Sequence, residues 1–257
     1  MYRKKGIGTF DLEPQGSLQD MINDLAKLPL EFSPGSRWNY SVSTDVLGYL
    51  IEKISGQPLD EYLQDNIFAP LKMKDTGFSI PKDKQERFSA CYMRGAKGEL
   101  TLQDDPQESY YLSKPSFLSG GAGLISTAED YLQFCKMLLN NGQLDGNQII
   151  GKKTLEFMTT NHLPDGCDLG SIATGSFSES LYDGVGFGLG FSVALDPTKS
   201  KTITSAGEFA WGGAASTAFW IDPEEDMAVV FMTQLLPSST YNFRGQLKQL
   251  IYGAIIE

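Results

Sequence analysis

Residues 32–57 read F-S-P-G-S-R-W-N-Y-S-V-S-T-D-V-L-G-Y-L-I-E-K-I-S-G-Q, a loop followed by an amphipathic helix. Ser43 or Thr44 is placed to cap this helix, and Gly56 is typical of the residue at which a helix ends. One apolar stripe is predicted along it, formed by Val46, Leu47, Leu50, Ile51 and Ile54. Tyr40 precedes the helix, so its side chain is either a packed aromatic or a group that moves a proton.

Further helices are predicted on both sides of this stretch, over residues 17–27, 59–68, 126–141 and 152–160, with a last one near residues 247–255. Two of them begin with a capping box, which reads S-L-Q-D in the first and S-T-A-E in the second. Residues 79–116 are polar and rich in proline, and they predict a long irregular excursion over the surface.

Beyond residue 185 the apolar pattern changes to the two-residue period of strands. Strands are predicted over residues 187–195, 214–221 and 227–234, with D-P-E-E-D before the last one as a hairpin loop. Helices followed by antiparallel strands predict an α+β fold. We expect residues 1–180 to form a mainly helical region that carries the Tyr40 loop, and residues 181–257 to add the antiparallel strands and a C-terminal helix.

The composition excludes several classes of function. A net charge of −11 argues against a nucleic-acid partner, because phosphate binding needs clustered Lys and Arg. No apolar stretch approaches the roughly 18–20 residues that span a bilayer, so no membrane partner is expected. Three cysteines without metal-site spacing predict free thiols in a reducing compartment. The chain shows no apolar leader, which favours a cytoplasmic location, although a signal could precede Met1.

A hydrolase built on histidine has little support in this sequence. His162 is the only histidine, and its T-T-N-H-L-P-D-G context is typical of a structural helix end. The glycines of residues 184–190 alternate with apolar residues, which indicates a closely packed strand and not a nucleotide loop. No G-x-S-x-G is present. A serine nucleophile would therefore need Lys or Tyr as its base, which returns attention to Tyr40.

Residues 210–217 read A-W-G-G-A-A-S-T and stand at the entry to a predicted strand. The two glycines, Gly212 and Gly213, leave the strand edge bare. A substrate carbonyl could then lie against backbone N–H groups there.

Four segments in this order resemble the serine β-lactamase and penicillin-binding-protein superfamily. They are P-G-S-R-W-N-Y-S-V-S-T-D-V-L-G, I-F-A-P-L-K-M-K-D-T-G-F, S-G-G-A-G-L-I-S-T-A-E-D-Y, and W-G-G-A-A-S-T with I-D-P-E-E-D-M-A-V-V-F-M-T-Q. Within the superfamily the resemblance is greatest to the family VIII carboxylesterases, which have a class C β-lactamase fold. It implies an antiparallel sheet with flanking helices and a mainly helical region, together part of one catalytic domain.

The resemblance also implies roles for individual residues. The Y-x-N element corresponds to Tyr40-Ser41-Val42, which makes Tyr40 the implied general base. The K-T-G element corresponds to Trp211-Gly212-Gly213. The N–H of Ala214 is then one implied oxyanion-hole donor, and the N–H of the nucleophile is the other. No metal or other cofactor is implied.

The S-x-x-K element of the superfamily, which carries the nucleophilic serine, has no counterpart before Tyr40. Ser79-Ile-Pro-Lys82 matches the letters, but Pro81 predicts a turn and the segment follows Tyr40. We therefore expect the chain to be the C-terminal portion of such an enzyme, without roughly 100 residues or more of the fold. An uncovered sheet edge and helix face would then need a complementing N-terminal segment or an exchanged homo-oligomer.

Two departures from the superfamily pattern bear on the substrate. Trp211 replaces the K-T-G lysine and Val42 replaces the Y-x-N asparagine, so polar contacts to a β-lactam are lost. With Gly212 and Gly213, these residues are expected to bind a neutral carboxylic ester with a short acyl chain, which is hydrolysed through an acyl-enzyme. The isolated chain is expected to be inactive. The alternatives are a β-lactamase or D,D-peptidase-type penicillin-recognising protein, and a non-catalytic binding relic. Residues 120–123 either line the cleft or form a turn.

Overall fold

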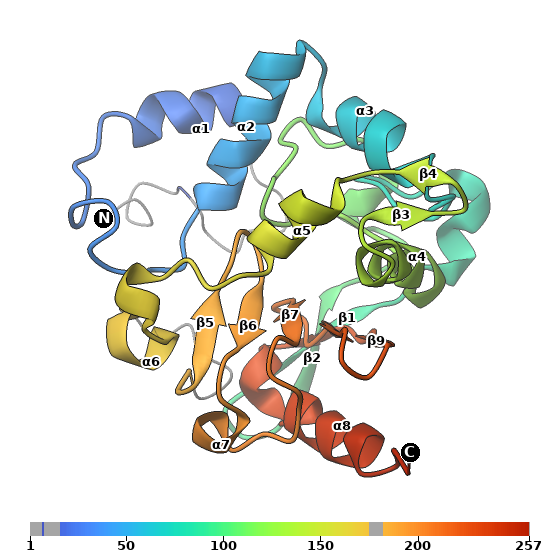
Figure 1. Ribbon diagram of the computed structural model, residues 1–257. Coiled ribbons are helices and arrows are strands. Elements are labelled where there is room, and N and C mark those ends of the chain that lie inside the picture. Colours follow the sequence, from blue (N-terminus) through green and yellow to red (C-terminus); the bar gives the residue numbers. More distant parts are fainter. Residues whose placement is uncertain (1–6, 8–15, 175–181, 257) are drawn as a thin grey trace.

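The computed structural model describes residue 7 and residues 16–174 and 182–256. Within these residues, five consecutive strands form an antiparallel sheet in the order β5-β6-β7-β8-β9 (Figure 1). The strands are Val185–Phe187, Ser192–Ala194, Phe209–Gly212, Ala218–Asp222 and Met227–Phe231. Each strand pairs with the next one along the chain, so the sheet is a meander. The α+β prediction is confirmed.

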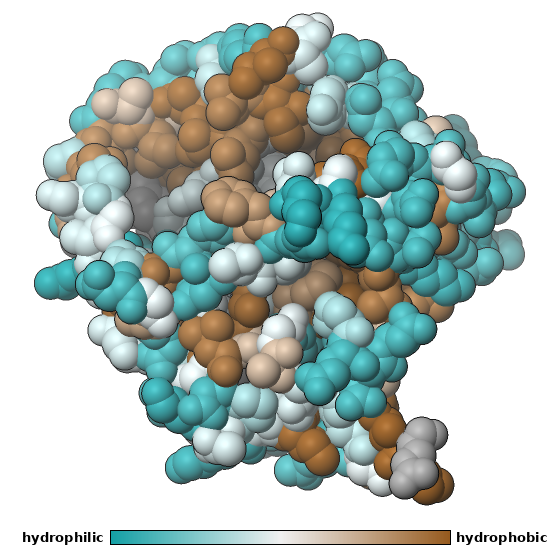
Figure 2. All heavy atoms as spheres, viewed as in Figure 1, coloured by the Kyte–Doolittle hydropathy of each residue, from teal (hydrophilic) through white to brown (hydrophobic). Residues whose placement is uncertain are grey.

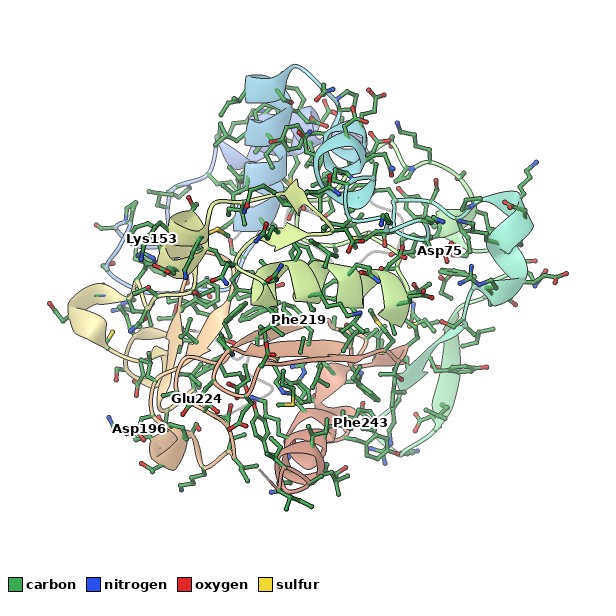
Figure 3. The ribbon with its side chains drawn as sticks, turned by 45° about the vertical axis from the view of Figure 1, so that its right-hand side comes forward. Asp75, Lys153, Asp196, Phe219, Glu224 and Phe243 are labelled. Atoms are coloured by element: carbon green, nitrogen blue, oxygen red, sulfur yellow. The ribbon has the colours of Figure 1, made fainter. Side chains whose placement is uncertain are left out.

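Two helices cover the two faces of this sheet. Helix α4 (Ala128–Leu139) packs on one face, where Tyr131 lies 5.1 Å from Phe219, ring centroid to centroid. Helix α8 (Phe243–Tyr252) covers the other face, toward which Trp220 points. Figure 3 shows Phe219 and Phe243 on these opposite sides. Successive side chains of β8 therefore point alternately toward α4 and toward α8.

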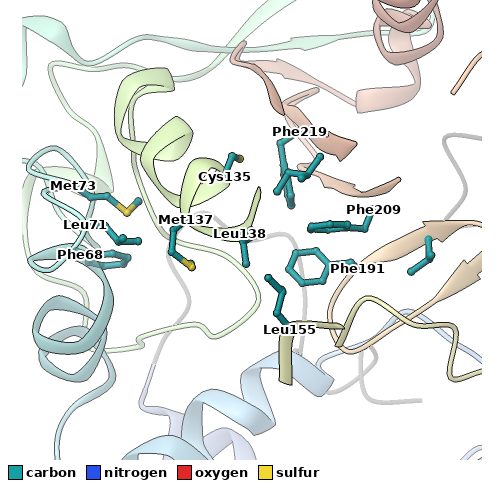
Figure 4. Close-up of a cluster of buried hydrophobic side chains, with 12 residues drawn as sticks. Phe68, Leu71, Met73, Cys135, Met137, Leu138, Leu155, Phe191, Phe209 and Phe219 are labelled. Carbon is teal, nitrogen blue, oxygen red and sulfur yellow. The ribbon is translucent and has the colours of Figure 1, made fainter. Parts of the chain in front are cut away.

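The main hydrophobic core lies between α4 and the sheet (Figure 4). Met137 and Leu138 of α4 stand between two groups of buried side chains. One group comes from residues 68–73, and the other comes from the sheet, with Phe209 and Phe219 in strands and Phe191 directly before β6. This core holds β7 rigidly from one side.

Polar contacts fix α8 on the opposite face of the sheet. Lys248 Nζ lies 2.6 Å from both carboxylate oxygens of Glu208, which is 3% exposed. The Tyr252 hydroxyl donates to Asp222 Oδ2 at 2.6 Å, and Asp222 is fully buried. These buried charges have partners, as their burial requires.

The predicted helices are present. Helix α1 (Leu18–Leu25) has the expected capping box between Ser17 and Asp20. The others are α2 (Ser43–Ser55), α3 (Leu59–Leu63) continued by a π-helix (Gln64–Phe68), and α5 (Lys152–Met158). Shorter helices are Lys82–Arg87, Tyr110–Leu112, Pro164–Gly166, α6 (Leu169–Ile172), α7 (Pro197–Ser200) and Ser238–Thr240.

Two predicted caps are wrong by one residue. Val42, which has no polar side chain, occupies the N-cap of α2, so neither Ser43 nor Thr44 caps it. The cap of α4 is Thr127, whose hydroxyl accepts from Asp130 N at 3.2 Å. At α4 the adjacent hydroxyl residues Ser126 and Thr127 cannot be separated by pattern alone, and at α2 the helix begins without any side-chain cap.

The strand predictions need larger corrections. Residues 187–195 are not one strand but the end of β5, a turn and β6, because Gly190 adopts a φ of 101°. The strand predicted from residue 214 begins at Ala218, and β7 was not predicted. Residues 79–116 are not wholly irregular, since they contain β1 (Cys91–Arg94) and β2 (Leu100–Asp104). A parallel pairing joins β1 to β10 (Leu235–Leu236), and β3 (Gln143–Leu144) pairs with β4 (Asn147–Gln148).

The apolar stripe of α2 lies largely on the surface. Val46, Leu47, Leu50 and Ile54 are 37%, 54%, 48% and 79% exposed, whereas Ile51 packs inward. Figure 2 shows apolar side chains gathered along α2, next to a hollow in this face of the molecule. A helix normally buries such a stripe, so among the described residues this face of α2 has no covering element.

Over the described residues, none of the helices combines the length and the apolar character that crossing a membrane requires.

Candidate active site

The fold brings Tyr40 and Trp211 together. Tyr40 lies in the loop before α2, and Trp211 lies in β7. Their rings stack with centroids 6.0 Å apart and planes 18° from parallel. Trp211 shares its sheet face with Phe209, so the α4 core supports it from the side. Two residues that the sequence singled out, about 170 positions apart in the chain, are thus in contact.

Three more aromatic rings extend this site. Trp38 lies 6.4 Å from Tyr40 and 5.2 Å from Phe187, and Phe187 lies 5.4 Å from Trp211, between ring centroids. Tyr182 packs against Trp38 at 6.1 Å. Sequence reasoning missed these three residues. A signal for Trp38 was present, because positions 38 and 40 share one side of an extended chain.

The surroundings of Tyr40 favour its neutral form. Burial raises the pKa of its phenol above the usual value, and the negative charge of Asp45 raises it further. A hydrogen bond from the Trp211 side chain acts in the opposite direction. A tyrosine that accepts a proton needs a nearby cation to lower its pKa. The described residues therefore present Tyr40 as a protonated phenol at neutral pH.

The loop of residues 119–123 packs on the first turn of α2. Ser119 Oγ donates to Asp45 Oδ1 at 2.5 Å, and Ala122 N donates to Ser119 Oγ at 2.9 Å. A Cβ on Gly120 would lie only 2.1 Å from the Thr44 carbonyl oxygen. The glycines therefore allow a close approach that holds the helix start, and with it Tyr40, in place.

The turn between β7 and β8 holds Ala214. Gly213 N donates to Thr217 O at 3.0 Å, and Ser216 N donates to Gly213 O at 3.1 Å. Trp211 and Gly212 lie at the end of β7, not at the entry to a strand as predicted, and Gly213 and Ala214 follow in the turn. Among the residues that the structure describes, no acceptor receives the N–H of Ala214. This donor is available to a ligand.

Val42 occupies a less open position than expected. Its side chain is 8% exposed at the N-cap of α2. The residue supports the base of the site and offers little surface to a substrate.

Ser79 and His162, the other residues considered as nucleophile and base, lie outside the group of aromatic residues around Tyr40. Ser79 precedes a 3₁₀ helix that begins at Lys82, so these two residues do not share an α-helix. Ser79 lines a cavity of about 540 Å³ whose walls include none of the site's five aromatic residues. His162 packs its ring against Phe157 at 4.4 Å and its Nε2 lies 2.7 Å from the Phe157 carbonyl oxygen, which fits a structural role.

Two glycines of residues 184–190 are closely packed, as predicted, although only Val185–Phe187 of this stretch is strand. A Cβ on Gly186 would lie 2.6 Å from the side chain of Asn161. A Cβ on Gly188 would lie 2.1 Å from the Met158 carbonyl oxygen. These glycines leave room for neighbouring segments of the backbone and side chains, which supports close packing over a nucleotide-binding loop.

Comparison with known proteins gives a consistent result. The family model described as Beta-lactamase matches residues 3–252. Protein Rv1367c of Mycobacterium tuberculosis is 35% identical over 216 residues, which are 83% of this chain and 52% of that protein. Esterase EstB of Burkholderia gladioli is 28% identical over 231 residues, which are 84% of this chain and 54% of EstB.

The solved structure of EstCE1, described as a hydrolase with promiscuous acyltransferase activity, superposes with a TM-score of 0.80. It is 26% identical and covers 98% of this chain and 66% of EstCE1. The chain spans about half the length of the curated relatives named above.

Proposed function

The chain belongs to the beta-lactamase family of serine hydrolases, and we propose that its site hydrolyses neutral carboxylic esters through an acyl-enzyme. The observation that carries this proposal is the stacking of Tyr40 on Trp211 beside the free N–H of Ala214. In this proposal Tyr40 is the acid–base group, Trp211 the apolar wall and the Ala214 N–H, three residues further along the chain, the oxyanion donor. The names of EstB and EstCE1, an esterase and a hydrolase, support the same reaction class.

The proposed reaction needs a serine and a lysine, and the described residues show neither side chain in contact with Tyr40 or Trp211. In the first step the serine Oγ attacks the ester carbonyl carbon, and its proton passes by way of Tyr40 and the lysine to the leaving alcohol. The Ala214 N–H stabilises the tetrahedral oxyanion. Water then attacks the acyl-enzyme and releases the acid. We propose that a complementing N-terminal segment with S-x-x-K supplies both side chains.

The same segment would also lower the pKa of Tyr40. Burial and Asp45 raise that pKa in the described residues, and an adjacent lysine ammonium would lower it. In this proposal the segment thus supplies the nucleophile and also the positive charge that makes Tyr40 a better base. This supports the expectation that the isolated chain is inactive.

The walls of the site favour a neutral substrate. Trp211 stands at the position of the family lysine, and Trp38 and Phe187 continue the apolar surface around it. Aromatic faces attract apolar groups and leave an anionic substrate without a counter-ion. A short acyl ester fits this wall better than a β-lactam carboxylate does.

The exposed face of α2 is where we propose that the complementing segment docks. The stripe is apolar, begins six residues after Tyr40 in the chain and borders the hollow in Figure 2. A segment docked on the first turn of α2 would lie next to the loop that carries Tyr40. Without that segment, copies of the chain would associate through the same face.

Hydrolysis of p-nitrophenyl acetate and butyrate tests the proposal, with mass spectrometry after a fluorophosphonate probe. The chain alone should show no turnover and no adduct. The chain with the S-x-x-K segment should show both, with the adduct on that segment's serine and much slower turnover of nitrocefin.

Tyr40→Phe in the complemented enzyme should lower kcat about 10²–10⁴-fold. Tyr92→Phe, an exposed tyrosine in β1, is the matched control. An adduct on Ser79 or another serine of this chain, or nitrocefin turnover equal to ester turnover, would overturn the proposal.

A further inference from the structure

Arg244, in the first turn of α8, contacts the site from the opposite face of the sheet. Its Nη2 donates to the carbonyl oxygens of Gly213, at 3.2 Å, and Thr217, at 3.0 Å. Figure 3 shows α8 on the far side of the sheet from α4. Arg244 thus holds the two ends of the β7–β8 turn together.

The geometry of one peptide links Arg244 to the proposed oxyanion donor. The Gly213 carbonyl and the Ala214 N–H belong to the same trans peptide unit. In a planar trans peptide these two groups point in opposite directions. A donor that fixes the carbonyl from behind therefore aims the N–H forward, and a cationic donor also polarises it.

The sequence of the turn makes room for this contact. A Cβ on Gly212 would lie 2.2 Å from Arg244 Nη2 and 2.5 Å from its Cζ. Alternation along β7 directs position 212 toward α8 and Trp211 toward the site. Glycine at position 212 is thus explained by the approach of the guanidinium.

We propose that Arg244 is a positioning residue for the oxyanion hole, acting through the Gly213–Ala214 peptide. The inference rests on the proposed function, because Ala214 is the donor in that function. In this proposal Arg244 acts on the reacting ester only through that peptide. Its removal should therefore weaken transition-state binding and leave ground-state binding of the ester unchanged.

The first test compares an ester with its thionoester in the complemented enzyme. Sulfur accepts hydrogen bonds weakly, so a thionoester gains little from the oxyanion donor. Arg244→Met should lower kcat for p-nitrophenyl acetate about tenfold, less than the loss expected for deleting a whole donor. KM and the rate with p-nitrophenyl thionoacetate should change little, so the ester-to-thionoester rate ratio falls. An unchanged ratio would overturn the inference and leave ester hydrolysis standing.

Two further variants separate positioning from folding. Gly212→Ala displaces the guanidinium but keeps Arg244, and it should give the same lowered ratio. Arg244→Lys keeps the positive charge and should restore part of the lost ester-to-thionoester rate ratio. Arg87→Met removes an exposed arginine paired with Asp75, and it should leave the ratio unchanged.

The second test needs no activity. In an ¹H–¹⁵N spectrum of this chain, Arg244→Met should move the Ala214 amide proton upfield, and Arg87→Met should not. If the complemented enzyme proves inactive, the proposed function fails and this resonance still decides the role of Arg244. An unmoved Ala214 resonance would overturn the inference.

Discussion

Replacing Leu50 and Ile54 by glutamine tests the unpartnered face of α2. Val46, Leu47, Leu50 and Ile54 together expose the equivalent of about two whole side chains. Burying two such side chains stabilises a complex by about 3–6 kcal/mol, and Leu50 and Ile54 supply more than half of that exposure. The double variant should therefore weaken docking on this face by about 2–3 kcal/mol, or roughly 30- to 150-fold in Kd.

Two measurements test this predicted loss of affinity. Isothermal titration with the S-x-x-K segment reports the loss of affinity, and sedimentation velocity over a concentration series reports self-association of the chain alone. Leu100→Gln with Leu102→Gln is the control, because these β2 side chains are 62% and 51% exposed and lie away from α2. The reasoning is refuted if the unaltered chain is a monodisperse monomer with normal cooperative unfolding, or if the β2 variant weakens association equally.

Gly120→Ala should destabilise the chain by about 1–3 kcal/mol in urea unfolding, because its Cβ meets a backbone carbonyl of α2 at 2.1 Å, whereas Gly77→Ala, with its nearest neighbour at 3.9 Å, should change little. Lys248→Met should cost about 3 kcal/mol by leaving its buried carboxylate partner without a cation, and the exposed Lys153→Met should have no measurable effect. Burial raises the pKa of the Cys135 thiol from 9.0 to about 12, so the folded state favours the neutral thiol. The stability that comes from keeping this thiol neutral is complete below pH 9. It is lost between pH 9 and 12, at up to about 1.4 kcal/mol per pH unit. Cys135→Ala should therefore reduce the fall in the free energy of unfolding over this pH range, as measured by urea unfolding.

The helices could be predicted because their signals are local. Ser17 and Asp20 cap α1 within four residues of each other, and Gly56 ends α2 in the left-handed conformation that favours glycine. The exposure of the α2 stripe could not be read from its own residues. Helical spacing shows which side chains share a face, and it does not show whether anything covers that face.

The strands were harder to predict because their partners are distant. The exposed residues of β2 give no alternation of burial, and β1 is held partly by β10 from the other end of the chain. Strand β7 was missed because F-A-W-G is short and ends in glycine. Pairing with its neighbours, more than local preference, makes such a segment a strand.

Tyr40 and Trp211 were predicted as members of one site by resemblance, and the structure places their rings in contact. Their catalytic and substrate-binding roles, with those of Ala214, Gly212, Gly213 and Val42, stay predictions. Trp38 and Phe187 were missed because ring contacts between separate segments leave no pattern in either segment. Arg244 was missed for the same reason, since its partners are backbone carbonyls of a remote turn.

The parallel pairing of β1 with β10 has a consequence for the order of folding. Tyr92 and Leu235 are register partners although about 140 residues separate them in the chain. Closing so long a loop costs about 4 kcal/mol of chain entropy, whereas each hairpin of the β5–β9 meander closes a short one. We expect the meander to form early and β10 to join β1 late. During that interval both strands present unpaired backbone, so refolding yield should fall as the protein concentration rises.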